Sequence, residues 1–535
     1  MKTMISSIIL ASCIALPLAS CSDSDVAPEQ KDWSTTTYFY SADAAMQDTY
    51  YKPTVGYVGD PMPFFDPVAG DFKVLYLQDF RPNPEGTYHP IWGVSTKDAA
   101  HYTSLGELVS CGTKKSQDAA IGTGSTIYDE ASKLYYTFYT GNKYLPTGDE
   151  SAQAVMVATS SDFKTWTKDR TFLLKGQDFG YDKNDFRDPF VFKGDDGKFH
   201  MLVSTKKGGK GSLAEFVSDD LKNWTDNGVF MTMMWDRFYE CPDLFKMGDY
   251  WYLVYSEIHH AVRRVQYFKG RTLDELKACT ANDAGRWPDA HEGFLDSRGL
   301  YAGKTASDGT NRYLWGWCPT RSGKDNTAVG ASPAEPEWGG NLVCYKLIQH
   351  EDGTLTLGQV DAVSEKYNQD VAVEVKESQN MTEADGTYTL ASKAQQPDAY
   401  MLMGRLGNHN KISFTVTTSN EWDKFGISMV RGSDSKKYYT MVVNPENEND
   451  RKINFEEQGV EGKGFIAGID GYVFARPADN VYNITIYTDN SICVMYINDV
   501  CSYTNRIYGI QKNCWSIDSF NGANVKVSNL KISQY

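Results

Sequence analysis

The sequence predicts an all-β protein: a five-bladed β-propeller followed by a C-terminal β-sandwich. Three observations support this prediction. Short strand-like runs fill residues 50–370, and a motif recurs about every 60 residues. After residue 375 the residue pattern changes to a polar segment followed by alternating runs. The composition agrees, because a chain of 535 residues with 34 Tyr and 45 Gly favours strands joined by turns.

The first 21 residues are expected to be a lipoprotein signal peptide. Lys2 supplies a positive charge, residues 4–18 form a short apolar run, and the segment ends Leu18-Ala19-Ser20-Cys21, which resembles a bacterial lipobox. We expect Cys21 to carry a lipid anchor and residues 22–45 to form a tether. A plain signal peptide with an incidental cysteine is the alternative. The expected location is the outer membrane of a Gram-negative cell envelope, facing either the surface or the periplasm.

The composition argues against several classes of protein. With 53 Lys and Arg against 69 Asp and Glu, the net charge is −16, which does not suit a nucleic-acid partner. No later segment has eighteen apolar residues in a row, so membrane contact is expected only through the lipid anchor. No cofactor or metal is expected either. The pairs His259-His260 and His291-Glu292 are interpreted as structural or substrate-rim residues, because adjacent strand residues point to opposite faces.

Residues 46–372 are predicted to form the propeller. Runs such as 72–77, 134–139 and 250–255 are rich in apolar and aromatic residues, which is typical of strands, and residues 273–279 could form a short helix. A motif with a hydroxyl residue two places before an aspartate recurs at Asp98, Asp162 and Asp220, 64 and 58 residues apart. A repeat of this length in a strand-rich chain indicates propeller blades, and the region holds about five of them. A sandwich with coincidental turns is the alternative.

The rest of the chain is predicted to be a separate unit. Residues 374–384 are polar and are expected to be a linker. Residues 385–535 contain alternating runs such as 411–416 and 483–487, which predict an antiparallel β-sandwich.

Three acidic motifs are the candidate chemistry of the chain. Asp60 precedes Pro61, Asp188 lies in Arg187-Asp188-Pro189, and Glu240 begins Glu240-Cys241-Pro242. If the repeats are blades, the three carboxylates occupy similar positions in their blades and converge at one end of the central channel. Their mutual repulsion pushes their pKa values apart, so one can be protonated while another is ionised. Glycoside hydrolysis requires this division of labour.

These motifs, in this order, resemble those of glycoside hydrolase family 32, the invertase, levanase and inulinase group, from about residue 50 to the C-terminus. The resemblance implies a retaining mechanism on oligo- or polysaccharides that contain fructose. Asp60 resembles the nucleophile, Asp188 the transition-state stabiliser and Glu240 the acid/base. The flanking motifs imply a set of substrate-binding residues: Gln78, Trp92, Thr123, Arg187, Tyr301 and Trp317.

The sequence also departs from the family pattern. Gly59 replaces the asparagine before the nucleophile, Thr123 replaces a serine, and residues 344–347 replace a Pro-Arg-Glu-Leu strand. Because the three carboxylates are kept, these departures concern sugar specificity more than hydrolysis. Two alternatives stay open: a glycosidase of the related five-bladed family that acts on arabinan or xylan, and a non-catalytic surface lipoprotein that binds glycans.

Overall fold

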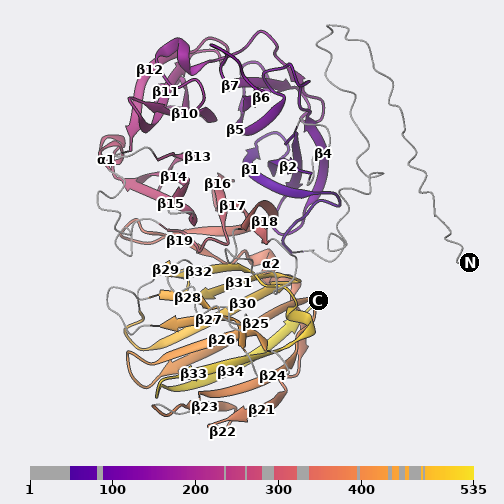
Figure 1. The fold of residues 1–535 in the computed structure, drawn as a ribbon, viewed down its shortest axis with the longest axis vertical. Coiled ribbons are helices and arrows are strands. Elements are labelled where there is room, and N and C mark those ends of the chain that lie inside the picture. Colours follow the sequence, from indigo (N-terminus) through magenta and orange to yellow (C-terminus); the bar gives the residue numbers. More distant parts are fainter. Residues whose placement is uncertain are drawn as a thin grey trace, which may run out of the picture.

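The computed structural model describes residues 49–535, apart from 81–87, 234–236, 260–261, 280–293, 322–335, 395–397, 432–436, 445–451, 457–471 and 474–475. The described chain is nearly all β and forms two bodies stacked end to end, a ring of small sheets and a sandwich (Figure 1). Cys21, the tether, His260, His291 and Glu292 lie outside the described residues. Within the described part, no helix is both long and apolar enough to cross a membrane.

The ring consists of five antiparallel groups of strands, which confirms the prediction of five blades. The first two blades are β1 (Tyr57–Asp66), β2 (Asp71–Asp79), β3 (Ile91–Thr96) and β4 (Thr103–Val109), then β5 (Ala120–Asp129), β6 (Leu134–Asn142), β7 (Gln153–Ser160) and β8 (Thr167–Lys168). The third and fourth are β9 (Phe186–Lys193), β10 (Phe199–Lys207), β11 (Lys210–Ser218) and β12 (Thr225–Thr232), then β13 (Glu240–Met247), β14 (Tyr250–His259) and β15 (Val262–Gly270). The fifth is β16 (Tyr301–Ser307), β17 (Arg312–Arg321), β18 (Pro336–Gln349) and β19 (Leu355–Gly358).

The first strand of every blade lines the centre of the ring. In order around the centre, β1 contacts β5, β5 contacts β9, β9 contacts β13, β13 contacts β16, and β16 returns to β1. A single pair, Val58 with Gly340, also joins the first and fifth blades through β1 and β18. The short helix α1 (Leu273–Ala278) follows the fourth blade, where the sequence predicts it, and Thr272 caps its N-terminus.

The recurring motif is one turn, repeated between the third and fourth strands of the first three blades. Asp98, Asp162 and Asp220 each accept hydrogen bonds from the backbone N–H groups two and three residues later. The residue after each aspartate has a positive φ, between 58° and 63°. The predicted repeat is therefore a structural unit of the blades.

The second body is a sandwich of two antiparallel sheets, which confirms the predicted fold class. The helix α2 (Asp361–Lys366) leads into it from the fifth blade. One sheet contains β20 (Gln369–Val371), β22 (Met381–Ala384), β23 (Thr387–Ala391), β25 (His409–Thr418), β30 (Val481–Asp489), β31 (Ile492–Ile497), β32 (Cys501–Arg506) and β34 (Asn524–Gln534). The other contains β21 (Val375–Gln379), β24 (Ala399–Arg405), β26 (Lys424–Arg431), β27 (Lys437–Asn444), β28 (Lys452–Glu456), β29 (Tyr472–Val473) and β33 (Cys514–Phe520).

The prediction of a linker at residues 374–384 is wrong. Residues 375–379 form β21 and residues 381–384 form β22, each at the edge of one sandwich sheet. Most of their side chains are exposed, so these strands lack the apolar alternation by which a half-buried strand is recognised.

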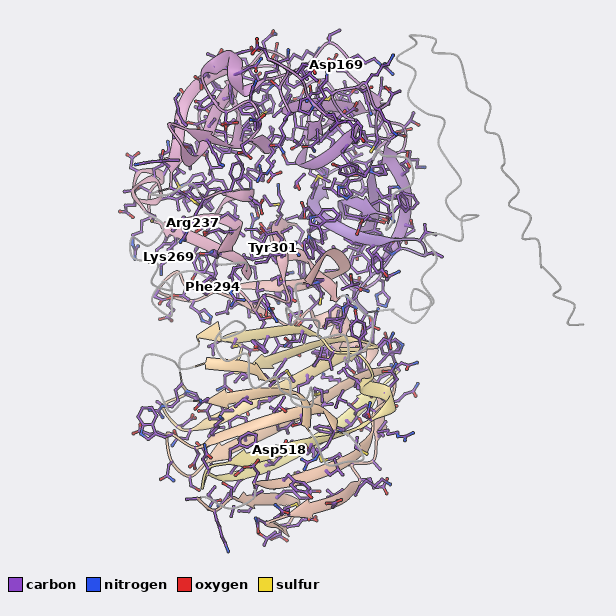
Figure 2. The ribbon with its side chains drawn as sticks, in the orientation of Figure 1. Asp169, Arg237, Lys269, Phe294, Tyr301 and Asp518 are labelled. Carbon is purple, nitrogen blue, oxygen red and sulfur yellow. The ribbon has the colours of Figure 1, made fainter. Side chains whose placement is uncertain are left out.

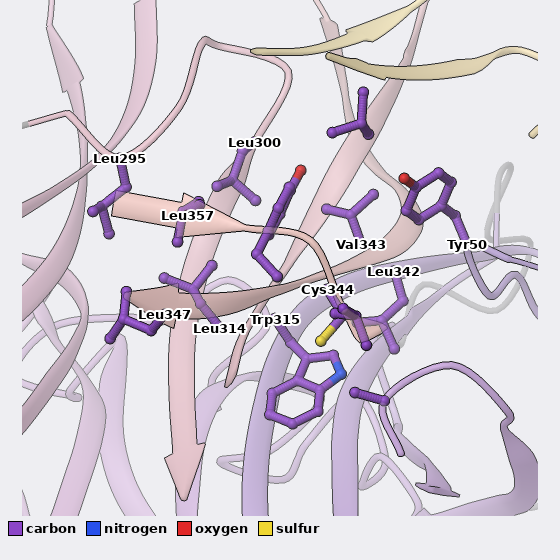
Figure 3. Packing of buried hydrophobic residues seen from close by; sticks show 14 of the residues in the cluster. Tyr50, Leu295, Leu300, Leu314, Trp315, Leu342, Val343, Cys344, Leu347 and Leu357 are labelled. Carbon is purple, nitrogen blue, oxygen red and sulfur yellow. The ribbon is translucent and has the colours of Figure 1, made fainter. Parts of the chain in front are cut away.

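One hydrophobic core includes residues of the fifth blade and of the sandwich. Figure 3 shows the part of this core around the fifth blade. Leu314, Trp315 and Leu342 of the blade are buried with Tyr487 and Val494 of the sandwich. The segment 344–347, which departs from the family pattern, belongs to this core, with its residues 344, 345 and 347 buried. Burying an aliphatic side chain of this kind contributes about 1.5–3 kcal/mol, so the core holds the two bodies together.

Candidate active site

All five inner strands carry a β-bulge near their first residues. The pairing register shifts between residues 58 and 61, 122 and 124, 187 and 190, 240 and 243, and 301 and 304. A bulge adds one residue to a strand and turns a side chain out of its usual direction. The three candidate carboxylates, Thr123 and Tyr301 all lie at these bulges. The fivefold repetition therefore brings residues from five blades to one place, and Figure 2 shows Tyr301 on the inner side of the fifth blade.

Three bulge residues have unusual backbone conformations. Asp188, Cys241 and Ala302 have φ values of 58°, 51° and 53°. Such values cost free energy in a residue other than glycine and persist where the surrounding structure enforces them, often at functional sites. The strain at Asp188 and Cys241 lies in two of the three acidic motifs.

Two neutral donors hold the carboxylate of Asp60. Thr123 Oγ1 donates a hydrogen bond of 2.6 Å to Oδ2, and Trp317 Nε1 donates one of 2.8 Å to Oδ1. Burial raises the pKa of Asp60, and the two hydrogen bonds oppose that rise. Because both oxygens are bonded, the orientation of the carboxylate is fixed.

Asp188 is more deeply buried, with 4 % of its surface exposed. Its backbone N–H donates to Thr140 Oγ1 at 2.9 Å, and its Oδ2 accepts from the backbone N–H of Cys241 at 2.9 Å. Burial raises the pKa of Asp188 to about 6, although the neighbouring Arg187 charge lowers it. This carboxyl therefore changes its protonation state in a weakly acidic solution.

Glu240 is held by a cation and a phenol. Arg187 Nη2 donates a 3.0 Å hydrogen bond to Oε1, and the hydroxyl of Tyr301 donates to Oε2. Arg187 is itself fixed by a 2.8 Å bond to Asp185 and by stacking of its guanidinium 3.7 Å from the ring centre of Phe238. Because the guanidinium is fixed, it holds Oε1 of Glu240 in one position and leaves Oε2 to Tyr301.

A tryptophan from another blade fills the space that a side chain at Gly59 would occupy. A Cβ atom at position 59 would lie 2.2 Å from ring atom Cη2 of Trp338 in β18, so the tryptophan occupies that space. Trp338 stacks on His89 at 4.2 Å between ring centres and lies 6.1 Å from the ring of Trp317. Tyr88, which is 41 % exposed, continues this row at 4.7 Å from His89. An aromatic wall of Tyr88, His89, Trp338 and Trp317 thus runs from the surface to Asp60.

Gln78 and Trp92, two of the expected sugar contacts, contact residues of the first blade and the segment before it. Gln78 is fully buried, and its Nε2 donates a 2.5 Å bond to the carbonyl oxygen of Val55. Trp92 packs against Phe80, with 5.9 Å between ring centres. Within the described residues, neither side chain bonds to one of the three carboxylates.

The remaining predicted residues contact the three carboxylates, together with further residues that the sequence does not predict. Thr123, Arg187, Tyr301 and Trp317 each hold one of the carboxylates, as described above. Sequence reasoning missed Trp338 and His89, because aromatic residues are common in strands and these two belong to no recognised motif. The described residues contain no group of three or more His, Cys, Asp and Glu side chains that could hold a metal ion. Three carboxylates with different partners in one site can combine nucleophilic attack with acid and base catalysis.

Family models match both bodies of the chain. Residues 50–361 match the model of the glycosyl hydrolases family 32 N-terminal domain, and residues 353–532 match that of the GH32, BT1760-like, C-terminal domain. The chain is 26 % identical over 310 residues to the beta-fructofuranosidase, insoluble isoenzyme CWINV2, of Arabidopsis thaliana, covering 52 % of this chain and 50 % of the relative. It is 26 % identical over 240 residues to a sucrose-6-phosphate hydrolase of Vibrio alginolyticus, covering 42 % and 45 %. The chain thus spans about half the length of these curated relatives.

Solved structures share the fold over almost the whole chain. A sucrose-6-phosphate hydrolase from Lactobacillus gasseri superposes with a TM-score of 0.67 at 18 % identity, covering 92 % of this chain and 94 % of its own. Fructan 1-exohydrolase IIa from Cichorium intybus superposes with a TM-score of 0.67 at 16 % identity, covering 91 % and 97 %. At these identities the likeness establishes the propeller and sandwich architecture.

Proposed function

The chain belongs to glycosyl hydrolase family 32, and from this premise we propose that it is a retaining glycoside hydrolase that cleaves fructosyl linkages in fructan or sucrose-type saccharides. The observation that carries the proposal is the meeting of Asp60, Asp188 and Glu240 at the bulges of three inner strands, each with different partners. Its curated relatives include a beta-fructofuranosidase and sucrose-6-phosphate hydrolases, which supports a fructose-containing substrate.

The proposed reaction has two steps. Asp60 attacks the anomeric carbon of the fructosyl unit while Glu240 gives its proton to the departing oxygen, so one bond forms as the glycosidic bond breaks. Water then attacks the same carbon, Glu240 takes a proton from it, and the carboxylate of Asp60 leaves. The buried Asp188 stabilises the positive charge that develops on the sugar in both steps. Arg187 and Tyr301 orient Glu240 for the transfer of its proton.

The test is product release by the chain from residue 22 onward on sucrose, inulin, levan and arabinan. Free fructose or fructo-oligosaccharides from one of the first three, lost in Glu240→Gln, are the expected result. The lengths of the products separate action at chain ends from action within chains. Release from arabinan alone would assign the protein to the related five-bladed family. Binding without any release would favour the glycan-binding lipoprotein.

The stereochemistry needs its own measurement. Methanol added to the reaction competes with water for the covalent intermediate and gives a methyl fructoside, whose configuration does not change in solution. Retention predicts the configuration of the substrate in that product. The opposite configuration would contradict the role of Asp60 as a nucleophile.

We further propose that Cys21 is lipid-anchored and holds the enzyme at the outer membrane of a Gram-negative envelope. The support is the lipobox-like segment, residues 18–21, and the acidic run that follows it. Metabolic labelling with a tagged fatty acid should mark the protein and should fail in Cys21→Ala. Protease added to whole cells then distinguishes the surface, where the protein is cut, from the periplasm, where it is protected.

A further inference from the structure

A buried lysine crosses the centre of the propeller. Lys304 lies in β16, three residues after Tyr301, and 2 % of its surface is exposed. Its Nζ donates a 2.9 Å hydrogen bond to the carbonyl oxygen of Gly124 in β5. In the ring, β5 lies between β1 and β9, whereas β16 lies between β13 and β1. The side chain therefore joins two blades that are not neighbours in the ring.

The acceptor of this bond is part of the site. A Cβ atom on Gly124 would lie 1.8 Å from the carbonyl oxygen of Phe138, so this position requires glycine and its backbone has little room to move. Gly124 directly follows Thr123, whose hydroxyl holds Asp60. Both residues are at the bulge of β5. A donor that fixes the carbonyl of Gly124 thus also fixes the direction from which Thr123 reaches Asp60.

The ammonium group faces acidic groups from several strands. The groups that interact with its charge are Asp60 of β1, Asp188 of β9, and Cys241 and Asp243 of β13. Burial lowers the pKa of Lys304, and Cys241 and the three carboxylates oppose that fall.

Phe190 and Asp243 also lie around the ammonium group. The ring of Phe190 in β9 lies 5.2 Å from the ammonium. Asp243 is bonded to the backbone N–H and hydroxyl of Thr305, at 2.7 and 2.6 Å, and feels the charge of Arg312. The charge of Lys304 also acts on Asp243, in addition to Asp60 and Asp188 of the site.

Within the part of the chain that the structure describes, two arginines also bring positive charge to the site. Arg187 bonds to Glu240 and lies beside Asp188. Arg263 of β15 lies 5.3 Å from the ring of Trp317, and its charge lowers the pKa of Asp60. Each arginine thus acts mainly at one side of the site, whereas Lys304 faces Asp60 and Asp188 together.

We propose that Lys304 is a positioning residue for the reaction: it ties the fifth blade to the bulge that aims Thr123 at Asp60, and its charge offsets the repulsion between Asp60 and Asp188. This inference rests on the proposed function, in which Asp60 reacts as a carboxylate. A side chain that only filled the channel would fix the bulge but would leave the ionisation of Asp60 unchanged.

The first experiment is the pH profile of kcat/KM for Lys304→Met and Lys304→Arg beside the parent. The acidic limb reports the ionisation of the carboxyls that must be charged in the free enzyme, Asp60 and Asp188, and the charge of Lys304 acts on both. In Lys304→Met, which lacks the charge, this limb should move to higher pH by about one unit. At acidic pH this shift lowers kcat/KM about tenfold. Lys304→Arg keeps the charge and should keep the limb in place, even where its larger side chain lowers the rate. An unmoved limb in Lys304→Met would overturn the proposal.

A second experiment needs no activity and so stays informative if the proposed function fails. Lys304→Met is compared with the parent in urea unfolding, and again in the Asp60→Asn, Asp188→Asn background. If the charge of Lys304 acts on these carboxylates, the substitution costs less stability where they are neutral. Folding only in the neutral background would give the same support. An equal loss in both backgrounds, or failure to fold in both, contradicts the proposal.

Discussion

The three carboxylates of the site differ in what binds them. Asp60 is held by a hydroxyl and an indole, Asp188 by a backbone N–H, and Glu240 by a guanidinium and a phenol. Among the described residues, Glu240 accepts a hydrogen bond from Arg187, whereas Asp188 lies 4.0 Å from Nε of the same guanidinium. The buried Asp188 consequently holds its charge at a cost, and its pKa rises to about 6.

This cost predicts that Asp188→Asn stabilises the protein while it damages the site. The pKa of Asp188 is higher in the folded chain than in the unfolded chain, so ionisation works against folding. The penalty is absent below about pH 4, grows as the pH rises to about 6 and is then complete, at about 3 kcal/mol. An asparagine avoids it and can still accept the bond from Cys241.

Urea unfolding at pH 4 and pH 8 checks this prediction. The variant should match the parent at pH 4 and exceed its free energy of unfolding at pH 8, whereas kcat should fall at least about a hundredfold. A variant that is no more stable than the parent at pH 8 would show that the structure offsets the burial of this charge.

Trp338 fills the space that a side chain at Gly59 would occupy, so we expect substitutions at these two positions to compensate each other. Gly59→Asn should displace the indole of Trp338 and lose both stability and activity, because its Cβ would overlap the ring. Trp338→Ala should mainly raise KM for polymeric fructan, since it interrupts the aromatic wall. In the double variant the asparagine has room, so the melting temperature should exceed that of Gly59→Asn alone. Additive losses in the double variant would contradict this pairing.

The motifs predict most of the site, and the structure shows why they miss the rest. Asp60, Asp188 and Glu240 lie in recognisable motifs with neighbouring proline, arginine or cysteine residues. These motifs place the carboxylates in order along the blades. Trp338 and Lys304 act through contacts with Gly59 and Gly124, each more than 150 residues away in the chain. A glycine in place of an asparagine signals that something is missing, but only the fold identifies the side chain that fills the space.

At the scale of elements, turn chemistry was easier to predict than sheet edges. The recurring aspartates of the first three blades satisfy backbone N–H groups within three residues, so their signal is local and survives in the sequence. The edge strands β21 and β22 depend on partners far along the chain and expose most of their side chains, so their sequence reads as a linker. The same distinction explains why the blade count could be predicted and the first strands of the sandwich could not.

The repeated turn predicts that Asp220→Ala destabilises the third blade. The backbone N–H groups of Lys222 and Asn223 donate to its carboxylate at 2.9 and 2.8 Å, and these bonds lower the pKa of Asp220 to about 2. Loss of an exposed acceptor of this kind costs about 1 kcal/mol, by analogy with a helix cap. The charge-dependent part of the stabilisation is present above about pH 4 and is lost as the pH falls towards 2.

Asp220→Asn is the matched control, because its side-chain oxygen can accept the same two bonds. The melting temperature at pH 7 should fall by a few degrees in the alanine variant and much less in the asparagine variant. Equal losses in the two variants would show that the charge, and not the turn geometry, matters at this position.

At the scale of the whole molecule, the sandwich reaches the site through the fifth blade. Arg506 of β32 is buried and donates to the carbonyl oxygens of Cys318 and Pro319 in β17, at 2.9 and 3.0 Å. It also bonds to Asn341 of β18 at 2.6 Å. Cys318 directly follows Trp317, the donor to Asp60. The sandwich therefore supports the strand that holds the proposed nucleophile.

This connection predicts that Arg506→Met impairs activity as well as stability, although the residue lies in the other body. Two buried carbonyl groups would lose a charged donor, at about 1–3 kcal/mol each, and β17 would be free to shift and weaken the bond from Trp317 to Asp60. We expect a lower melting temperature together with a lower kcat at temperatures where the variant is fully folded. Arg476→Met is the control, because Arg476 bonds to Glu421 and Asn480 within the sandwich. If Arg506→Met melts earlier but keeps the kcat of the parent, the sandwich stabilises the propeller without positioning Trp317.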